Sequence, residues 1–220
     1  MKPHRLVAPL ILAVVLMVVL AIGPHPAGAQ PKAAEQTGPL DLVKASVSRV
    51  LAIVQSPYVV ASDGGQRRTD IRRVAQGLFD FNEMARLTLA RHWKDRSAQE
   101  QEEFVRLFTD LLERSYLTSI ENYAGEKITF LGESVSGPYA QVRSRIVTDR
   151  RMEISIEYRL FESGARWAVY DVVLDGVSLV SNYRSQFNSI IRTSSFADLL
   201  AKLRSKQIEA HVIPRTGRGS

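Results

Sequence analysis

The stretch Trp167–Phe187, WAVYDVVLDGVSLVSNYRSQF, decides the fold of this chain, because it holds an apolar strand, a turn and the start of a helix in direct succession. Trp167 to Leu174 is an apolar run typical of a strand buried on both faces. Asp175-Gly176 is a turn dipeptide, after which Val177 to Val180 is predicted to continue in extended form. From Ser181 the apolar residues take helical spacing. The stretch therefore predicts a last strand that leads into a helix across one end of a sheet.

The residues before this stretch alternate between apolar and polar side chains, as strands with one buried face do. Lys127 to Leu131 is predicted to be a short strand, and Tyr139 to Thr148 a longer one. Met152 to Leu160 alternates most strictly and follows a predicted hairpin at Asp149 to Arg151. Ser163-Gly164 then turns the chain into the last strand. We therefore expect successive strands to form an antiparallel meander.

Helical spacing dominates the chain before these strands. Apolar residues recur every three or four positions from Asp41 to Val54, and a basic helix with a thin apolar stripe follows. Asp80 with Glu83 has the spacing of a capping box, and so does Ser97 with Glu100. The second box opens the longest helix, whose inward face runs from Phe104 to Ile120. We expect this long helix to cover one whole face of the sheet.

The predicted fold class is α+β, with N-terminal helices packed on a curved antiparallel sheet and C-terminal helices after it. The last of these is a small helix from Phe196 to Leu203, with Ser194 or Ser195 as its N-cap. A long amphipathic helix in a strongly bent sheet makes a half-barrel, which either fills with side chains or keeps a cavity. The apolar surplus of the last strand and the helices fits both outcomes.

The first residues of the chain predict export. Lys2 and Arg5 precede an apolar run from Leu6 to Ile22, and Ala27-Gly28-Ala29 is a cleavage pattern. Because Pro9 interrupts the run, we favour a cleaved signal peptide over a membrane anchor. The predicted division of the chain is a signal peptide at 1–29, a flexible leader at 30–39, a single domain at 40–206 and a disordered tail at 207–220.

Composition narrows the classes of function. The 220 residues include no cysteine, and only His92 and His211 follow the predicted cleavage site. This scarcity argues against a disulfide scaffold, a zinc site and a Cys/His nucleophile. Cleavage would leave 27 basic against 23 acidic residues, and no basic cluster interleaved with aromatics indicates nucleic acid. An exported chain without cysteine, large enough for a sizeable core, is typical of a bacterial periplasm.

Catalysis on this fold would depend on Asp171 in the last strand, with Tyr158 or Tyr170 as a phenol partner for proton transfer. The simpler interpretation is an aspartate satisfied by a neighbouring strand or by an arginine. No glycine-rich phosphate loop is present. Arg184 either pairs with an anionic group, as a headgroup or partner contact, or satisfies carbonyls at a helix end. We therefore expect no catalytic residue and no metal ligand.

Four segments together carry a resemblance to a known family. They are FDFNEMARLTLARHW at 79–93, QEEFVRLFTDLLERSYLTSI at 101–120, EYRLFESGARWAVYDVVLDGVSLVSNYRSQF at 157–187 and DLLAKLRSK at 198–206. The chain resembles the MlaC family of periplasmic phospholipid-binding proteins, also called the toluene-tolerance auxiliary component family, over about residues 40 to 206. The hopanoid-associated HpnM proteins look similar. One departure is Arg192–Asp198, where the family usually has a glycine-containing turn.

The resemblance implies an NTF2-like core with an internal lipid cavity, and a monomeric periplasmic carrier that binds phospholipid as ligand without any cofactor. The implied partners are an inner-membrane ABC transporter lipid-transfer complex and an outer-membrane lipoprotein complex, with no nucleic acid. Three alternatives stay open: an HpnM-like carrier of hopanoid or squalene, a half-barrel enzyme, and an adaptor with a filled core. The residues expected to line the tail cavity are Met84, Leu87, Phe104, Phe108, Leu111, Tyr116, Ile156, Tyr158, Val169, Tyr170, Val172 and Leu174.

Overall fold

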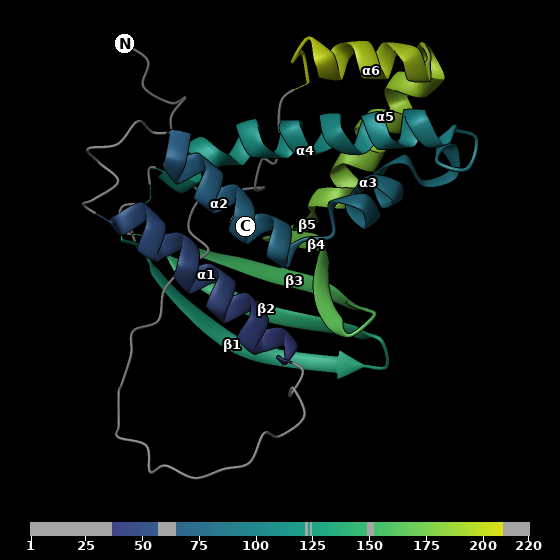
Figure 1. Cartoon of the computed structure of the whole chain (residues 1–220). Coiled ribbons are helices and arrows are strands. Elements are labelled where there is room, and N and C mark those ends of the chain that lie inside the picture. Colours follow the sequence, from purple (N-terminus) through teal and green to yellow (C-terminus); the bar gives the residue numbers. More distant parts are fainter. Residues whose placement is uncertain (1–36, 57–64, 122, 124, 149–151, 209–220) are drawn as a thin grey trace, which may run out of the picture.

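The structure is a computed structural model that describes residues 37–56, 65–121, 123, 125–148 and 152–208 (Figure 1). The predicted signal peptide, most of the predicted leader, the hairpin at 149–151 and the tail from residue 209 lie outside these described residues. Within the described ranges, no helix is both long enough and apolar enough to cross a membrane.

The sheet is an antiparallel meander of five strands in the order β1-β2-β3-β4-β5, which confirms the α+β fold class and the predicted succession of strands. Its first strand continues five residues past Leu131, where the prediction ended it. A register shift between Phe130 and Gly132 lets this edge strand bend while it stays paired. The strands are β1 (Lys127–Ser136), β2 (Tyr139–Val147), β3 (Glu153–Ser163), β4 (Arg166–Leu174) and β5 (Val177–Ser178).

The opening stretch folds as a strand, a tight turn and a helix. Asp175 and Gly176 take φ angles of 45° and 81°, so the predicted turn is formed by two left-handed residues, as in a type I′ hairpin. Strand β5 is shorter than predicted, and helix α5 begins at Leu179 rather than at Ser181. The reason is the cap: the Ser178 side chain accepts a hydrogen bond from the backbone N–H of Ser181 at 3.0 Å.

The helices begin where the capping residues predict. The Asp80 side chain accepts from the Glu83 N–H at 2.9 Å, and Ser97 and Glu100 form the reciprocal bonds of a capping box. Ser195 caps the last helix, within the segment that departs from the family pattern. The helices are α1 (Pro39–Gln55), α2 (Gly65–Leu78), α3 (Phe81–Leu89) followed by the short η3 (Ala90–His92), α4 (Ala98–Glu121), α5 (Leu179–Thr193) and α6 (Phe196–Arg204).

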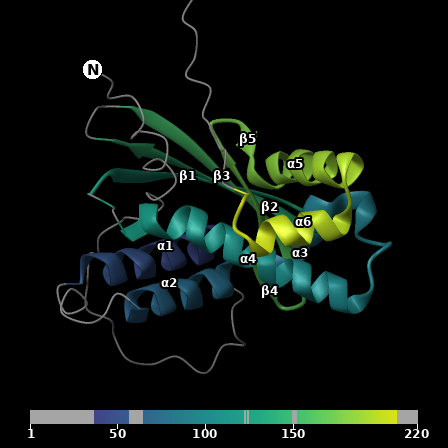
Figure 2. The same cartoon turned by 90° about the horizontal axis from the view of Figure 1, so that it is seen from above.

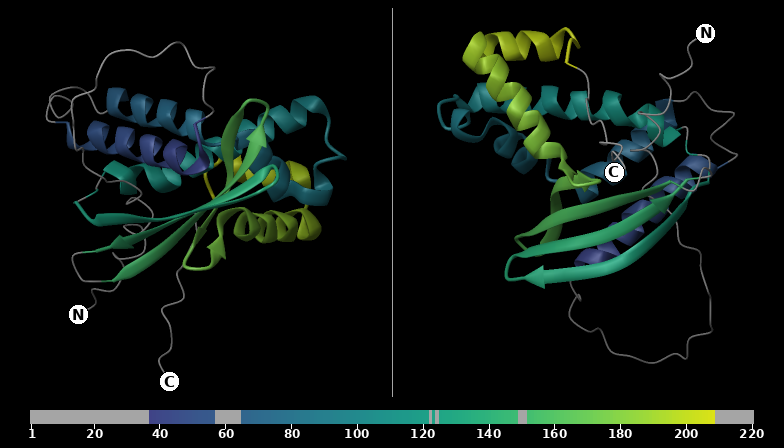
Figure 3. Two further views of the ribbon diagram at one scale, coloured as in Figure 1. Left: turned by 90° about the horizontal axis from the view of Figure 1, so that it is seen from below. Right: turned by 180° about the vertical axis from the view of Figure 1, so that it is seen from behind.

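Helix α1, and not the long helix α4, covers the sheet, so the prediction for α4 was wrong. α1 lies along β1 and β2, and its Leu40 N–H donates to the Glu133 side chain of β1 at 2.7 Å (Figures 1 and 2). Figure 3 shows α4 farther from the sheet, beneath α6. The inward face of α4 is apolar as predicted, but it packs against other helices.

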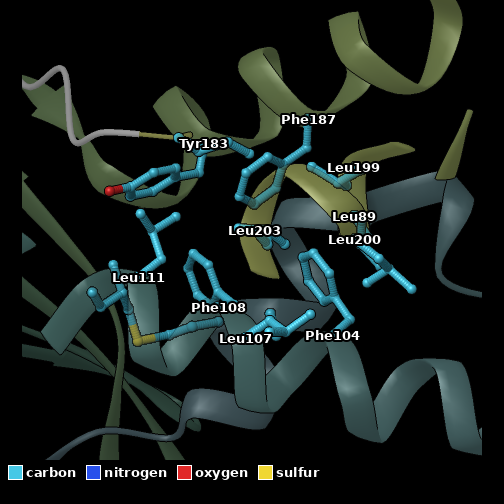
Figure 4. Close-up of a cluster of buried hydrophobic side chains, with 14 of the residues drawn as sticks. Leu89, Phe104, Leu107, Phe108, Leu111, Tyr183, Phe187, Leu199, Leu200 and Leu203 are labelled. Carbon is cyan, nitrogen blue, oxygen red and sulfur yellow. The ribbon is translucent and has the colours of Figure 1, made fainter. Parts of the chain in front are cut away.

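The buried side chains form two apolar clusters. The sheet cluster joins α1 to the inner face of the strands through residues such as Val47, Val142 and Leu160. The helical cluster joins α3, α4, α5 and α6, and Figure 4 shows the rings of Phe104, Phe108, Tyr183 and Phe187 facing one another within it. The rings of Phe108 and Tyr183 meet edge to face with centroids 5.5 Å apart. Any space between the two clusters is therefore bounded by a sheet wall and a helical wall.

Candidate functional site

An apolar cavity of about 200 Å³ lies between the two clusters. Helices α1 and α2 supply one side, α4 another, and the α2–α3 corner, β3 and β4 close the rest. The lining residues are Ser46, Val47, Val50, Leu51, Val54, Ile71, Arg72, Val74, Ala75, Leu78, Phe79, Phe81, Met84, Leu112, Glu113, Tyr116, Leu117, Ile120, Tyr123, Tyr158, Val172 and Leu179. Because a cavity is present, the alternative of a completely filled core does not hold.

The corner between α2 and α3 is held against the sheet by backbone contacts. Phe79 forms a parallel bridge with Val169, and the Asp80 N–H donates to the Val169 carbonyl at 2.9 Å. The Arg166 guanidinium also donates to the Gly77 carbonyl at 3.3 Å. These bonds hold the end of α2 against β4. Leu78, Phe79 and Phe81 line the cavity at this corner.

Two ion pairs join α2 to α4 beside the cavity. Arg72 donates to both carboxylate oxygens of Glu113 at 2.6 and 2.7 Å. One turn earlier in α2, Arg68 donates to both oxygens of Glu121 at 2.9 and 3.0 Å. The first pair belongs to the cavity wall, whereas the second does not. Since Arg72 is about half exposed, the first pair lies where the cavity meets the surface, and the second lies farther along the same two helices.

Three tyrosines line the cavity. The Tyr123 hydroxyl donates to the Glu126 carbonyl at 2.8 Å, and the other two, Tyr116 and Tyr158, are more deeply buried. Burial raises the pKa of Tyr158, and the neighbouring Ser144 hydroxyl offsets this only in part. Burial also raises the pKa of Tyr116, with a further contribution from Tyr183. Both phenols therefore stay protonated and neutral at physiological pH. They add hydrogen-bonding groups to the wall without adding charge.

Four of the predicted cavity residues line the cavity: Met84, Tyr116, Tyr158 and Val172. The others lie elsewhere among the described residues. Phe104, Phe108 and Leu111 are fully buried in the helical cluster, and Leu87 packs at its edge. Ile156, Val169 and Leu174 belong to the packed sheet cluster. These seven residues support the two walls but do not face the space between them.

Tyr170 points away from the cavity because β4 contains a bulge. The register between β3 and β4 shifts between Arg159 and Leu160, so that Arg159 pairs with Asp171 and Leu160 pairs with Val169. Tyr170 is the extra residue, and its ring packs against Tyr139 and Phe161 on the outer face of the sheet. Its prediction as a cavity residue was wrong for this reason.

Asp171 holds the start of α5 through hydrogen bonds. Its carboxylate accepts hydrogen bonds from the Val180 N–H at 3.0 Å, from the Ser178 hydroxyl at 2.7 Å and from Arg159 at 3.3 Å. It is buried beneath the start of α5, on the face of the sheet opposite Tyr158. The structure therefore does not bring Asp171 and Tyr158 together as the catalytic alternative requires. The simpler interpretation, an aspartate satisfied by its neighbours, is confirmed.

Arg184 takes the second of its two predicted roles. Its Nε donates to the Leu87 carbonyl at 2.9 Å, which satisfies an acceptor in the last turn of α3 and ties α5 to that helix. It does not line the cavity. The described residues contain no cluster of potential metal ligands.

The residues that the sequence reasoning missed come mainly from α1 and α2. Val50 and Val54 of α1, and Ile71, Val74 and Ala75 of α2, all line the cavity. Their apolar spacing is visible in the sequence and predicts the two helices, but spacing alone does not indicate a cavity. The useful signal would have been the narrow apolar face of α2, which is flanked by arginines. A helix with so narrow an apolar face is better placed at the edge of a cavity than in the middle of a core.

The fold and the cavity define a class of α+β protein in which a meander sheet and a helical layer enclose an apolar site. The family model described as "MlaC protein" matches residues 44–205, and the chain belongs to the MlaC family. A curated relative, the intermembrane phospholipid transport system binding protein MlaC of Haemophilus influenzae, is 22% identical over 174 residues, which cover 76% of this chain and 81% of the relative.

A solved structure has the same fold. It is the phospholipid-binding protein from Ralstonia solanacearum in complex with a phospholipid. It superposes with a TM-score of 0.69 and 21% sequence identity, and the match covers 78% of this chain and 97% of the other. The predicted family and fold class are thereby confirmed.

Proposed function

We propose that this protein binds phospholipid in the periplasm and carries it between an outer-membrane lipoprotein complex and an inner-membrane ABC transporter complex. The observation that carries the proposal is the apolar cavity between the sheet cluster and the helical cluster. Membership of the MlaC family supports it. So do the Haemophilus influenzae relative, named for intermembrane phospholipid transport, and the Ralstonia solanacearum structure, described with bound phospholipid.

The physical need for such a carrier is large. Each methylene exposed to water costs about 0.8 kcal/mol, so two bare acyl chains of membrane length cost on the order of 20 kcal/mol. A carrier has to bury nearly all of both chains, whereas the polar headgroup can stay in water. Because burial is not directional, ordinary apolar side chains such as Val50, Ala75 and Leu117 are sufficient lining.

The size of the cavity indicates how the protein would load. A volume of about 30 Å³ for a water-sized group means that a cavity of about 200 Å³ takes roughly seven methylenes. Two complete chains need more room, so loading would move the walls apart. The sheet wall is a continuous hydrogen-bonded ladder, while α2 and α4 face each other through exposed ion pairs. We therefore expect the cavity to widen between α2 and α4.

Direction of transfer would not be set by this chain. A carrier without an energy source only equilibrates lipid between the partners it meets, in proportion to their affinities for the loaded and empty states. An ATP-driven complex at the inner membrane would then determine the net flow. The protein itself has to release lipid as readily as it binds it. A cavity that holds acyl chains by apolar burial, without directional bonds, fits this requirement.

The identity of the lipid bound on purification tests the proposal. The protein is purified from cells without added lipid, and native mass spectrometry is followed by extraction and identification of the ligand. We expect one phospholipid per chain. A squalene- or hopanoid-like molecule would support the HpnM-like alternative instead, and the absence of any stoichiometric lipid would contradict the carrier proposal.

A second experiment addresses the partners. Purified protein loaded with labelled phospholipid is mixed with membranes that contain or lack the inner-membrane transporter complex. We expect transfer of the label to depend on that complex. Transfer at the same rate to membranes without it would contradict the proposed partner, although it would leave the binding of phospholipid intact.

A further inference from the structure

The cavity wall contains one cation and one anion, and they are paired with each other. Among the described residues that line it, Arg72 and Glu113 are the only charged side chains. The guanidinium holds the carboxylate in a two-pronged pair, Nε to Oε1 and Nη2 to Oε2, at 2.6 and 2.7 Å. The side chain of Arg72 is 45% exposed and that of Glu113 is 23% exposed, so this pair is accessible from solvent.

The surroundings of Arg72 are basic on its own helix. α2 carries Arg67, Arg68, Arg72 and Arg73 against a single acidic residue, Asp70. Arg73 pairs with Asp70 at 2.7 Å on the same helix, and Arg68 pairs with Glu121 of α4. The carboxylates that face Arg72 itself all come from α4, where Asp110 adds to the effect of Glu113. An anion that approaches along α2 therefore meets guanidinium groups at the border of an apolar space.

A phosphate can replace Glu113 as the partner of Arg72. Water and salt reach this pair and screen it, because Arg72 is about half exposed. A guanidinium binds a phosphate with the same two-pronged geometry as a carboxylate. A phosphate that is attached to apolar chains has an additional advantage over Glu113, because burial of the chains brings it to the rim.

We propose that Arg72 binds the phosphate group of a lipid whose chains occupy the cavity, and that Glu113 occupies this guanidinium in the empty protein and is displaced on loading. The inference rests on the proposed function and specifies its ligand as a phosphate-bearing lipid. It differs from a purely structural interpretation, in which the pair only latches α2 to α4. In that interpretation both partners of the pair would matter in the same way.

The test compares two short-chain lipids with identical acyl chains, phosphatidylglycerol and diacylglycerol, which differ in the phosphate headgroup. Binding to delipidated protein is measured by isothermal titration calorimetry for the wild type, Arg72→Gln and Glu113→Gln. The matched control is Arg73→Gln, on the same helix, 71% exposed and outside the cavity wall. Circular dichroism melting shows whether each variant is folded.

We expect the two substitutions to act in opposite directions. Arg72→Gln lowers the affinity for phosphatidylglycerol about tenfold, as expected for a lost hydrogen-bonded charge pair. Glu113→Gln raises it by up to about fivefold, since an exposed competing pair is removed. Neither changes the affinity for diacylglycerol, and Arg73→Gln changes neither lipid. The double variant binds phosphatidylglycerol like Arg72→Gln alone.

Changes in the same direction for both substitutions, or equal changes for both lipids, would overturn the inference in favour of a structural latch. Inorganic phosphate is titrated into the lipid-free protein as a separate arm, where we expect no saturable binding. Saturable binding that depends on Arg72 would assign the site to free phosphate and overturn it as well. If neither lipid binds the wild type, the proposed function fails, and that result differs from binding without a role for Arg72.

Discussion

Filling the cavity with protein should replace the ligand and stabilise the fold. Ala75 lies on the cavity side of α2, and Ala75→Phe adds one phenyl ring to a space of about 200 Å³. A cavity of about 150 Å³ is known to hold benzene, so the volume is sufficient for the ring. Burial of the ring contributes about 1.5–3 kcal/mol, and the poorer helix propensity of phenylalanine costs up to about 0.7 kcal/mol. The expected net gain is therefore about 1–2 kcal/mol.

Two measurements on purified protein check this prediction. Compared with delipidated wild type, thermal unfolding should shift upward by roughly 2–8 °C, since each kcal/mol corresponds to about 2–4 °C for a domain of this size. Native mass spectrometry should show that the bound lipid is lost. The control is Gln76→Phe, the next residue on the same helix, which is exposed and should leave lipid content unchanged. A variant that keeps its lipid at the wild-type ratio would refute the assignment of the cavity as the tail site.

Four further substitutions separately test the cavity, the packed sheet, the anchor of α5 and the cap of α4. Val172→Glu places a carboxylate in the cavity wall and should abolish lipid loading in a folded protein, whereas Ile156→Glu buries it in the packed sheet cluster and should unfold the chain; circular dichroism and lipid extraction distinguish the two. Asp171→Asn weakens the anchor of α5 and should cost about 1–3 kcal/mol in urea unfolding, so an unchanged midpoint would contradict that role. The backbone N–H of Ser97, and then its hydroxyl, lower the pKa of Glu100, so this group stabilises the protein above its unfolded pKa of about 4.3 and loses that effect as pH falls through the folded value. Glu100→Gln should lack this acid-side loss, which unfolding experiments across the acidic range would show.

The sheet and the helix starts could be predicted because their signals are local. Alternation in β3 specifies which side chains are buried, and the structure buries Ile154, Ile156, Tyr158 and Leu160 as this pattern requires. The caps of α3 and α4 depend on residues three positions apart, so they are also visible in the sequence. The order of the strands then follows, because short connections join antiparallel neighbours.

The face of β4 could not be predicted, because a bulge breaks its alternation. Val169 and Val172 are separated by an odd number of positions and yet both lie on the inner face, opposite Leu160 and Tyr158 of β3. A regular strand would place them on opposite faces. Tyr170 absorbs the extra residue and turns outward. Val, Tyr and Asp are all compatible with either face of a strand that is buried on both faces. The local sequence of β4 therefore does not show where the bulge lies.

The sequence also could not show which element each helix packs against. Periodicity in α4 shows correctly that Phe104, Phe108 and Leu111 are buried, but an apolar stripe fits a sheet and a helix equally well. Here the aromatic side chains of α5 meet α4, and the branched side chains of α1 meet the strands. Which helix covers the sheet therefore decides where the cavity lies. The sequence prediction placed α4 on the sheet. For this reason most of the residues predicted to line the cavity lie instead within the two clusters that form its walls.

The cavity itself is evidence of function when its energetic cost is considered. In an enclosed apolar void the lost packing costs about 24 cal/mol per Å³. This cavity of about 200 Å³ opens to the surface beside Arg72, so its cost lies below the roughly 5 kcal/mol of an enclosed void of that size. Even part of that cost is a sizeable share of the whole stability of many domains, about 5–15 kcal/mol. Residues such as Ala75 and Val74 could be exchanged for larger ones that fill the space, as Ala75→Phe tests. A ligand that enters this space recovers the same free energy on binding, so the void that weakens the empty protein also supplies affinity for an acyl chain.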